Sequence, residues 1–321
     1  TDVIQVVVLL AGALLCLIII PFEVQGGFSH ILEVIGSEGK INIFNFDYDF
    51  TTTTFWVVLL GGLGANLISY GSDQAVIQRY LTTSDERSAA KGIWTNALLS
   101  VPATLLFFSV GTALFIFYKD NPAMLNPLVT NADAIFPLFI VTQLPNGIAG
   151  LLIAGIFAAA MSSLDSSMNS VASVITTDFF KRFNPHVSDQ SSLRVAKWST
   201  AVVGIAGTAF ALVMAGWDIK SLWDQLSAFV GLFAGGLGGV FILGIFTRRT
   251  NGAGAITGLV ASGIIQFLVK SYTPMHLLLY SFTGMVSCII IGYLSSLIFY
   301  GSSNQRKESA SASTHEEIIS D

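Results

Sequence analysis

Eight long apolar runs constrain the fold of this chain more than any other feature. A helix needs about 20 apolar residues to cross a bilayer, and in lipid only a helix satisfies every backbone amide within one such run. The runs cover roughly residues 3–21, 52–80, 92–118, 144–177, 195–216, 222–246, 253–271 and 277–300. We therefore predict an all-α polytopic membrane protein with eight spanning helices.

The overall composition agrees with a membrane protein and excludes other classes. Hydrophobic residues make up 53% of the chain and charged residues 11%, which is far from the balance of a soluble protein of this length. The 15 Lys and Arg residues are scattered and the net charge is −5, so no surface for a nucleic acid is expected. Cys16 and Cys288 lie inside apolar runs, where packing is their expected role rather than a disulfide, a metal site or a nucleophile.

The connections between the runs alternate between rich and poor in Lys and Arg. Because cytoplasmic loops retain these residues, the rich set is predicted to be cytoplasmic, together with the C-terminus, and the protein to lie in the plasma (inner) membrane. The rich set is Arg79, Arg87, Lys91, Lys181, Arg182, Arg194, Lys197, Arg248, Arg249, Arg306 and Lys307, and the poor set is Lys40, Lys119, Lys220 and Lys270.

Two external connections and the tail carry further expectations. Residues 22–51 and 119–143 are long enough to hold short interfacial helices, which we expect at the apolar stretches 27–35 and 134–141. They would act as outer gates or as lids. The tail, residues 301–321, is rich in Ser, Glu and Ala and is predicted to be disordered, because it has little to bury.

A single carboxylate, Asp165, lies in the middle of the fourth run, within the segment 158–170 (AAAMSSLDSSMNS). A charged side chain at that depth costs at least about 2.5 kcal/mol on insertion scales, so Asp165 should be protonated or face a cation or water. The neighbouring oxygens come from Ser162, Ser163, Ser166, Ser167, Asn169, Ser170 and Ser173. Such hard ligands suit an alkali or alkaline-earth ion and do not suit zinc or copper.

Helical spacing groups these oxygens, because residues three and four apart share a face. Ser162, Asp165 and Ser166 form one cluster. Ala159, Ser162 and Ser163 form an adjacent one, in which the small Ala159 leaves its backbone carbonyl reachable if the helix opens locally. A serine-rich stripe alone is more often a surface for helix packing, but the carboxylate favours a bound cation.

Other polar residues are open to two interpretations. Asp2, at the start of the first run, is an interfacial charge or helix cap, or else part of a site. Asp73 and Gln74, late in the second run, are either buried or paired locally with Arg79.

Glycines gather in residues 61–66 of the second run and 231–239 of the sixth, near the middle of the membrane by count. They mark either helix breaks of the kind that transporters use to bind ions and substrates, or close helix packing.

Four segments, in order along about 300 residues, resemble the sodium/solute symporter family, whose members transport sugars, sialic acid, proline, monocarboxylates and vitamins. Residues 1–5 (TDVIQ) resemble the family's fifth core helix, and residues 74–79 (QAVIQR) resemble the end of its sixth. Residues 158–170 resemble its eighth, ion-binding helix, and residues 240–249 (VFILGIFTRR) the end of its tenth. On these segments the chain is identified as a member of that family.

The resemblance implies a leucine-transporter-like fold of five plus five helices in inverted repeat. This chain would supply core helices 5–10 and two peripheral helices. Core helices one to four are expected to be missing, because the chain begins at Thr1 directly before an apolar run. The implied divisions are 1–21 as the last helix of the first repeat, 22–51 as an external loop, 52–246 as the second repeat, 247–300 as two peripheral helices and 301–321 as a cytoplasmic tail.

Transferred by position, the family's main sodium site comprises the carbonyl of Ala159 and the hydroxyls of Ser162 and Ser163. A second cation site, found in members that couple two ions, comprises Asp2, Ser162, Asp165 and Ser166. Asp165 departs from the family, which has a hydroxyl residue there. The added charge is compatible with tighter binding, a changed stoichiometry or a bound proton.

The resemblance also implies solute contacts, at Asn66, Ser69, Asp73, Gln74 and Ser227. Asn66 matches an amide that holds the sugar in galactose-transporting members. However, Ser69, beside Tyr70, replaces a gating aromatic, Ser227 falls near an expected glutamine, and the third run lacks an expected lysine. A neutral hexose is therefore disfavoured, and an acidic sugar such as sialic acid, a monocarboxylate or an amino acid is expected.

These observations predict a sodium-coupled symporter that imports a small polar organic solute, acts as a monomer in the bilayer and needs sodium but no other cofactor. The alternative is a membrane sensor of solutes with a transporter-like fold. An enzyme is not expected, because no His lies in the middle of a run and no pair of nucleophile and base is visible.

Overall fold

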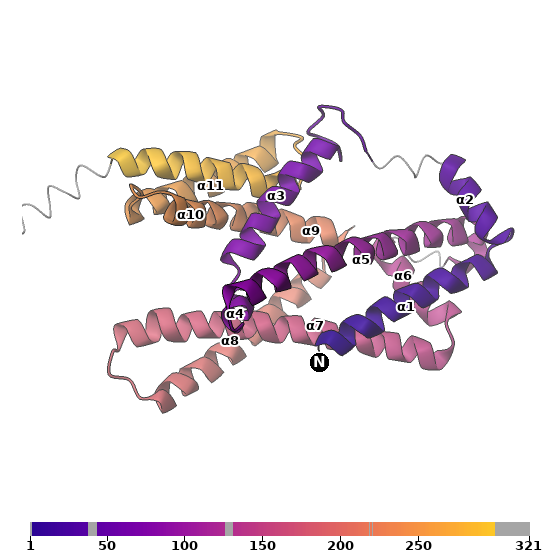
Figure 1. The fold of residues 1–321 in the computed structure, drawn as a ribbon, viewed down its shortest axis with the longest axis horizontal. Helices are drawn as coiled ribbons and strands as arrows, with labels where there is room; N and C mark the ends of the chain where they lie inside the picture. Colours follow the sequence, from indigo (N-terminus) through magenta and orange to yellow (C-terminus); the bar gives the residue numbers. More distant parts are fainter. Residues whose placement is uncertain (1, 38–43, 126–130, 218, 220, 299–321) are drawn as a thin grey trace, which may run out of the picture. The chain divides into compact units, whose positions relative to one another are not determined.

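The computed structural model describes residues 2–37, 44–125, 131–217, 219 and 221–298, which form helices and, within these ranges, no strand (Figure 1). The α-helices are α1 (Asp2–Glu23), α2 (Gly27–Ser37), α3 (Phe55–Ser72), α4 (Gln74–Leu81), α5 (Glu86–Asp120), α6 (Ile135–Gln143), α7 (Asn146–Val174), α8 (Asp189–Ala215), α9 (Leu222–Phe229), α10 (Gly235–Phe246) and α11 (Gly252–Tyr272). A further helix, here called the 279–298 helix, spans Leu279–Ile298. The predicted tail, 301–321, lies outside the described residues.

Eight helical stretches among the described residues are long and apolar enough to cross a membrane, and each coincides with a predicted run. Two of them contain a π-helical turn. Residues Ile175–Lys181 extend α7, and residues Val230–Ala234 join α9 to α10. The short helices expected in the two long connections are present as α2 and α6. The predicted all-α architecture is confirmed.

The second run differs from its prediction, because α3 ends at Ser72 rather than continuing to residue 80. Asp73 has an extended backbone, and its carboxylate accepts a hydrogen bond from the N–H of Ala75 at 2.8 Å. A short acidic side chain that bonds to the nearby backbone competes with continuation of a helix. The break therefore falls at Asp73, and α3 is continuous through its glycines.

By its internal packing the chain divides into two compact units. Unit 1 comprises residues 1–42 and 78–221, and contains α1, α2, α5, α6, α7 and α8. Unit 2 comprises residues 43–77 and 222–321, and contains α3, α9, α10, α11 and the 279–298 helix.

In unit 1, α1 and α7 pack closely and run antiparallel. Gly12 of α1 lies against the side chain of Leu152, and Gly155 of α7 lies against Val8. Residue numbers therefore rise along α1 as they fall along α7. This direction agrees with the alternation expected for the first and fourth of eight spans.

The core of unit 1 gathers buried side chains from α1, α5 and α6, among them Cys16, Phe117 and Phe139. The rings of Phe117 and Phe139 meet edge to face at 5.3 Å. The imidazole of His30 in α2 contacts the carboxyl group of Asp120 at the end of α5, with Nε2 and Oδ2 3.2 Å apart. Because Cys16 is free and buried, its predicted packing role is confirmed.

Glycines in unit 2 mark the closest approach of α3 to the 279–298 helix and the residue before it. A Cβ atom added at Gly61 would lie 2.5 Å from the carbonyl oxygen of Leu278, and one at Gly64 would lie 2.6 Å from the backbone nitrogen of Phe282. Backbone atoms cannot move away as a flexible side chain can. These glycines serve close helix packing, which is one of the two predicted interpretations.

The sixth span packs on the same helix. A Cβ atom added at Gly235 would lie 3.0 Å from the carbonyl oxygen of Ser281, and one at Gly239 would lie 2.6 Å from the Cβ atom of Cys288. Residue numbers rise together along α10 and along the 279–298 helix, so these two helices are parallel. The contacts of Gly61 and Gly64 show in the same way that α3 is parallel to the 279–298 helix. Cys288 is free and buried here, so its predicted packing role is also confirmed.

The seventh span, α11, runs in the opposite direction to the 279–298 helix. Ser262 donates a hydrogen bond to the carbonyl oxygen of Gly284 at 2.7 Å, and the fully buried Gln266 donates to the hydroxyl of Thr283 at 2.8 Å. Polar side chains that bond across helices stabilise packing in lipid by about 0.6 kcal/mol each. Within unit 2, the directions of the second, sixth, seventh and eighth spans follow the predicted alternation.

Candidate cation site

The predicted cation ligands lie along one unbroken helix, α7. No Pro or Gly occurs between Ile156 and Val174, and the segment is rich in Ala, Met and Ser, so nothing local interrupts the helix. The carbonyl oxygen of Ala159 is therefore engaged in the regular i to i+4 bonding of α7,. One of its two lone pairs remains available to a cation. The irregular π-helical turn falls later, at Ile175–Lys181.

Serine hydroxyl groups in this segment donate their protons to carbonyl oxygens one turn earlier. Ser166 donates to the carbonyl oxygen of Ser162 at 3.0 Å, Ser167 to that of Ser163 at 3.0 Å, and Ser170 to that of Ser166 at 2.9 Å. A hydroxyl that donates inward keeps its lone pairs pointing outward. The helix thus presents hydroxyl oxygens in the form that a hard cation needs.

Exposure separates the predicted ligands into a half-buried line and an exposed edge. Ala159, Ser162 and Ser166 are half-buried, whereas Ser163 and Asp165 are exposed. The first three residues lie three or four positions apart and share one face of α7. Asp165 lies beside that face. Among the described residues, no three His, Cys, Asp or Glu side chains come together as a metal-binding group.

The remaining predicted ligand, Asp2, is the first residue of α1. The contacts of Gly12 with Leu152 and of Val8 with Gly155 set the register of α1 against α7. Because both helices rise by 1.5 Å per residue, the same register continued to the start of α1 brings the backbone of Asp2 level with Ser162. The residues predicted for the second cation site therefore come from the same level of unit 1.

The predicted solute contacts lie in unit 2, on α3, α4 and α9. Asn66, Ser69 and Asp73 follow one another at spacings of three and four residues, and all three are exposed. Asn66 and Ser69 occupy the side of α3 opposite its packed glycines, and Asp73 follows directly after the end of that helix. The amide of Asn66 donates to the carbonyl oxygen of Gly62 at 2.8 Å.

Asp73 is exposed rather than buried, and its carboxylate caps α4. Gln74, the first residue of α4, is also exposed. Ser227 is half-buried within α9. The structure thus places Asn66 and Ser69 on one face of α3, followed by Asp73 at the break after that helix and by Gln74 at the start of α4.

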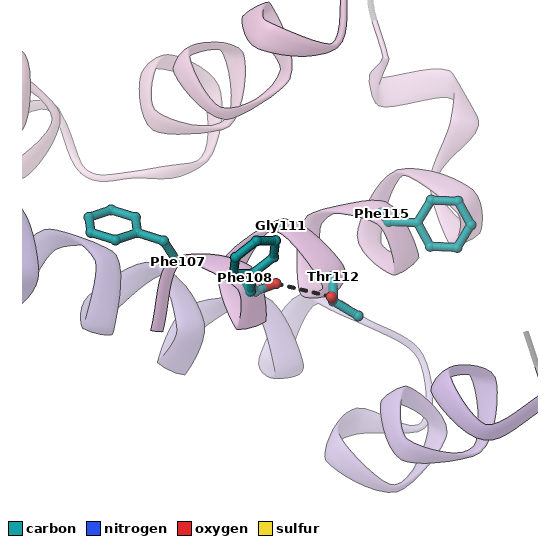
Figure 2. A pocket seen from close by; sticks show the side chains of 5 residues that line it. All are labelled: Phe107, Phe108, Gly111, Thr112 and Phe115. Carbon is teal, nitrogen blue, oxygen red and sulfur yellow. Dashed lines mark hydrogen bonds between the residues drawn. The ribbon is translucent and has the colours of Figure 1, made fainter. Parts of the chain in front are cut away.

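A pocket of about 410 Å³ lies along α5 and includes none of the predicted site residues (Figure 2). It is lined by Phe107, Phe108, Gly111, Thr112 and Phe115. The hydroxyl of Thr112 donates to the carbonyl oxygen of Phe108 at 3.0 Å (Figure 2), and the other lining residues are three phenylalanines and Gly111. This pocket offers no carboxylate or amide to an ion or a polar solute.

The described part of the chain contains eight membrane-length helices, with a carboxylate and a line of hydroxyl oxygens midway along the fourth. These features define a polytopic α-helical membrane protein with polar groups at membrane depth. The chain belongs to the sodium:solute symporter family, whose sequence pattern matches residues 1–262. The predicted family and its leucine-transporter-like fold are confirmed.

Individual relatives are similar over most of this chain. It is 35% identical over 308 residues to the sodium/sialic acid symporter NanT of Aliivibrio fischeri, covering 95% of this chain and 60% of that protein. It is 31% identical over 274 residues to the sodium-coupled monocarboxylate transporter 2 of Mus musculus, covering 84% of this chain and 44% of that protein.

A solved structure supports the same relationship. It shows the substrate-bound, outward-open state of a Na⁺-coupled sialic acid symporter and is described as revealing a novel Na⁺ site. Its TM-score is 0.80 at 36% identity, and the match covers 93% of this chain and 61% of that one. The chain spans about 60% of the length of the sialic acid symporters that it matches.

Proposed function

We propose that the full-length protein is a sodium-driven symporter that imports a small acidic organic solute, with sialic acid as the first candidate. The observation that carries this proposal is the oxygen-lined face of α7, where the half-buried Ala159, Ser162 and Ser166 follow one another within a membrane-length helix. A serine-rich face alone could serve helix packing, but the carboxylate of Asp165 beside it favours a cation, because a charge at membrane depth needs a partner.

We assign the main sodium site to the carbonyl of Ala159 and the hydroxyls of Ser162 and Ser163, and a second cation site to Asp2, Ser162, Asp165 and Ser166. The helical spacing of Ala159, Ser162 and Ser163 supports the first assignment, and the hydroxyl of Ser166, which donates to the carbonyl oxygen of Ser162 and keeps its lone pairs outward, supports the second. The register of α1 against α7, which brings Asp2 level with Ser162, also supports the second.

An acidic sugar is favoured as the solute for two reasons. Relatives at 35% and 36% identity are named as sodium/sialic acid symporters, whereas the sodium/glucose cotransporter of Vibrio parahaemolyticus is 28% identical. In addition, Ser69 stands in place of a gating aromatic residue, and α5 has no lysine between Lys91 and Lys119. We place the solute contacts at Asn66, Ser69, Asp73, Gln74 and Ser227.

The energy available from sodium entry is sufficient for accumulation. Each charge that crosses the membrane inward gains about 2.3 kcal/mol per 100 mV. Two sodium ions entering with a singly charged acidic solute carry a net charge of +1, so the potential supplies about 2.3 kcal/mol per 100 mV, or roughly a fortyfold concentration ratio at about 1.4 kcal/mol per decade. The sodium concentration gradient adds to this. This inward direction requires a plasma (inner) membrane, and the distribution of Lys and Arg supports a cytoplasmic C-terminus.

The division of the chain follows from the same proposal. We propose that residues 1–21 end a first repeat, that 52–246 form a second, inverted one, and that 247–300 are peripheral. Within each unit, the helices whose contacts give their directions alternate as this scheme requires, and this agreement supports it.

Uptake by the full-length protein in proteoliposomes tests the function directly. We expect labelled sialic acid to accumulate with an inward sodium gradient and to equilibrate without accumulation when potassium replaces sodium. A sodium ionophore should abolish accumulation, and unlabelled acidic sugars should compete better than glucose. Equal uptake in both gradients would exclude sodium coupling. Binding of the solute without any uptake would indicate a sensor.

A change at Asp165 tests the second cation site. We expect Asp165→Asn to raise the sodium concentration for half-maximal uptake by about tenfold, which corresponds to about 1.4 kcal/mol, because an amide oxygen lacks the charge of a carboxylate ligand. The measurement is the sodium dependence of initial uptake rates. Thr208→Ala is a suitable control, because this hydroxyl in α8 also bonds one turn back and belongs to no predicted site. An unchanged sodium dependence in Asp165→Asn would remove this residue from the cation site.

A further inference from the structure

A buried amide in the middle of unit 2 has only part of its hydrogen bonds satisfied. Gln266 of α11 is 0% exposed, and its amide nitrogen Nε2 donates to the hydroxyl oxygen of Thr283 at 2.8 Å. Its amide oxygen Oε1 is buried as well and has no hydrogen-bond partner among the described residues. Because buried polar atoms are nearly always hydrogen-bonded, Oε1 needs a donor that these residues do not supply.

Three helices of unit 2 enclose this amide. α10 and α11 lie side by side (Figure 1), and the 279–298 helix packs on both of them. A Cβ atom added at Gly284 would lie 3.2 Å from Nε2 of Gln266 and 3.3 Å from the Cα atom of Gly235. The amide therefore lies close to the backbones of α10 and the 279–298 helix. Since Gln266 is fully buried by this chain itself, neither lipid nor a further segment is needed to cover it.

The two hydroxyl groups beside Gln266 cannot supply the missing donor. Thr283 donates its proton to the carbonyl oxygen of Leu279 at 2.9 Å, and Ser262, one turn before Gln266 on α11, donates to the carbonyl oxygen of Gly284 at 2.7 Å. Each hydroxyl group has a single proton. Both groups therefore have only lone pairs left, and a lone pair accepts hydrogen bonds, as Oε1 does.

The sixth span brings a further acceptor close to the same amide. Residues Val230–Ala234 form a π-helical turn that packs against α11, and Gly235 follows this turn directly. In a π-helical turn each N–H bonds five residues back instead of four, so one carbonyl oxygen is passed over where the regular pattern resumes. In a membrane, a side chain or an ordered water satisfies such a freed group. The freed carbonyl oxygen and Oε1 are both acceptors and cannot bond to each other.

We propose that Gln266 binds a single buried water molecule, which donates one hydrogen bond to Oε1 and the other to the carbonyl oxygen freed by the π-helical turn. Water brings two donors to a place where the unsatisfied groups are acceptors. The close approach of the backbones at Gly235 and Gly284 favours an occupant of this size. Because Nε2 also bonds to Thr283, one side chain and one water then link the sixth, seventh and eighth spans.

A sodium ion would also bond to oxygen atoms, but the charge of the surroundings disfavours it. Residues 225–298 contain no Asp or Glu, and a charge buried in a membrane needs a partner of opposite sign. A neutral donor of hydrogen bonds has no such requirement. The proposed water site lies within unit 2 and does not depend on sodium coupling.

A crystal structure of the full-length protein, at a resolution that shows ordered water, tests the site directly. We expect a peak of electron density at about 2.5–3.0 Å from Oε1, the usual range for O–H···O bonds. The peak should be unchanged when rubidium replaces sodium in the crystals. An anomalous signal from rubidium at this position would overturn the proposal in favour of a cation. The absence of a peak beside the amide would overturn it in favour of bonds within the protein.

The variant Gln266→Met distinguishes a bound water from an oxygen atom without a partner. Methionine is unbranched and of similar length, and it has no amide. If the water is bound, the substitution removes the bonds of Gln266 to Thr283 and to the water, and leaves the freed carbonyl without a donor. We then expect the midpoint of thermal unfolding in detergent to fall by several degrees. If Oε1 has no partner, its removal relieves the cost of a buried unsatisfied acceptor. An unchanged or raised midpoint would therefore overturn the proposal.

Thr257→Val is the matched control for Gln266→Met. The hydroxyl of Thr257 lies on the same helix, is exposed and donates one turn back to the carbonyl oxygen of Ala253 at 2.8 Å. It belongs to no predicted site, so this variant should unfold at nearly the same temperature as the unmodified protein. A fall of equal size in both variants would assign the effect to the loss of any polar group from α11 and would contradict a specific water site.

Discussion

Replacing Ser162 and Ser163 together by alanine should abolish sodium-driven uptake by the full-length protein while the protein remains folded. The two hydroxyls are two of the three ligands that we assign to the main sodium site on α7. If each contributes as a hydrogen bond to a charged group does, at about 1.5–3 kcal/mol, their joint loss weakens sodium binding by about a hundredfold or more. The measurement is the initial rate of sialic acid uptake across a series of sodium concentrations.

A matched control for this double variant is available in α5. Ser100 and Ser109 each donate to a carbonyl oxygen one turn earlier at 2.7 Å, in another membrane-length helix. Ser100→Ala with Ser109→Ala removes the same two groups from the same kind of helix without touching a predicted ligand. We expect nearly normal sodium dependence in the control. Normal sodium dependence in the Ser162 and Ser163 variant as well would remove both residues from the sodium site.

Gly64→Ala should strongly destabilise the packing of unit 2. The added methyl carbon would lie 2.6 Å from the backbone nitrogen of Phe282 and 2.8 Å from its Cα atom. Because these are backbone atoms of a packed segment, the helices must separate, and overpacking of this kind costs about 1–3 kcal/mol. Thermal unfolding of the detergent-solubilised protein, followed by circular dichroism, should show a midpoint lowered by several degrees.

The neighbouring Gly62→Ala is the control for Gly64→Ala. It lies two residues away in the same helix, and a Cβ atom added there meets no atom within 4 Å. Since alanine favours a helix by up to about 1 kcal/mol relative to glycine, Gly62→Ala should be neutral or slightly stabilising. If both variants unfolded at the same temperature, α3 would not pack on the backbone of Phe282 as the structure shows.

Hydropathy was sufficient to predict the spans, because a backbone in lipid must form all its hydrogen bonds internally and therefore becomes helical. A run such as 144–177 has no water to satisfy its amides, so it becomes helical whatever packs around it. The predicted clusters of Ser162, Asp165 and Ser166 and of Ala159, Ser162 and Ser163 likewise required only helical geometry. The structure leaves Ala159, Ser162 and Ser166 half-buried and the other two residues exposed. Their role as cation ligands stays a prediction.

Other features of the fold depend on specific interactions between side chains and backbone, which a hydropathy profile does not describe. The end of α3 at Ser72 results from a hydrogen bond between the Asp73 carboxylate and the N–H of Ala75, which an average over apolar residues does not detect. The sequence analysis did not single out Gln266 either. Its only signal was an amide inside the apolar run 253–271, and only the folded chain shows that its amide oxygen has no partner among the described residues.

The amino-acid sequence by itself determined the all-α class, the family and the eight predicted spans, because these follow from local composition and from short motifs. The predicted alternation of directions is seen for the first and fourth spans within unit 1 and for the second, sixth, seventh and eighth within unit 2. Tertiary structure decided whether the glycines of α3 break the helix or pack it, since Gly61 and Gly64 meet Leu278 and Phe282, more than two hundred positions away along the chain. A glycine has the same identity in a hinge and in a tight helix contact. Only the atoms opposite it, brought there by the fold, distinguish the two.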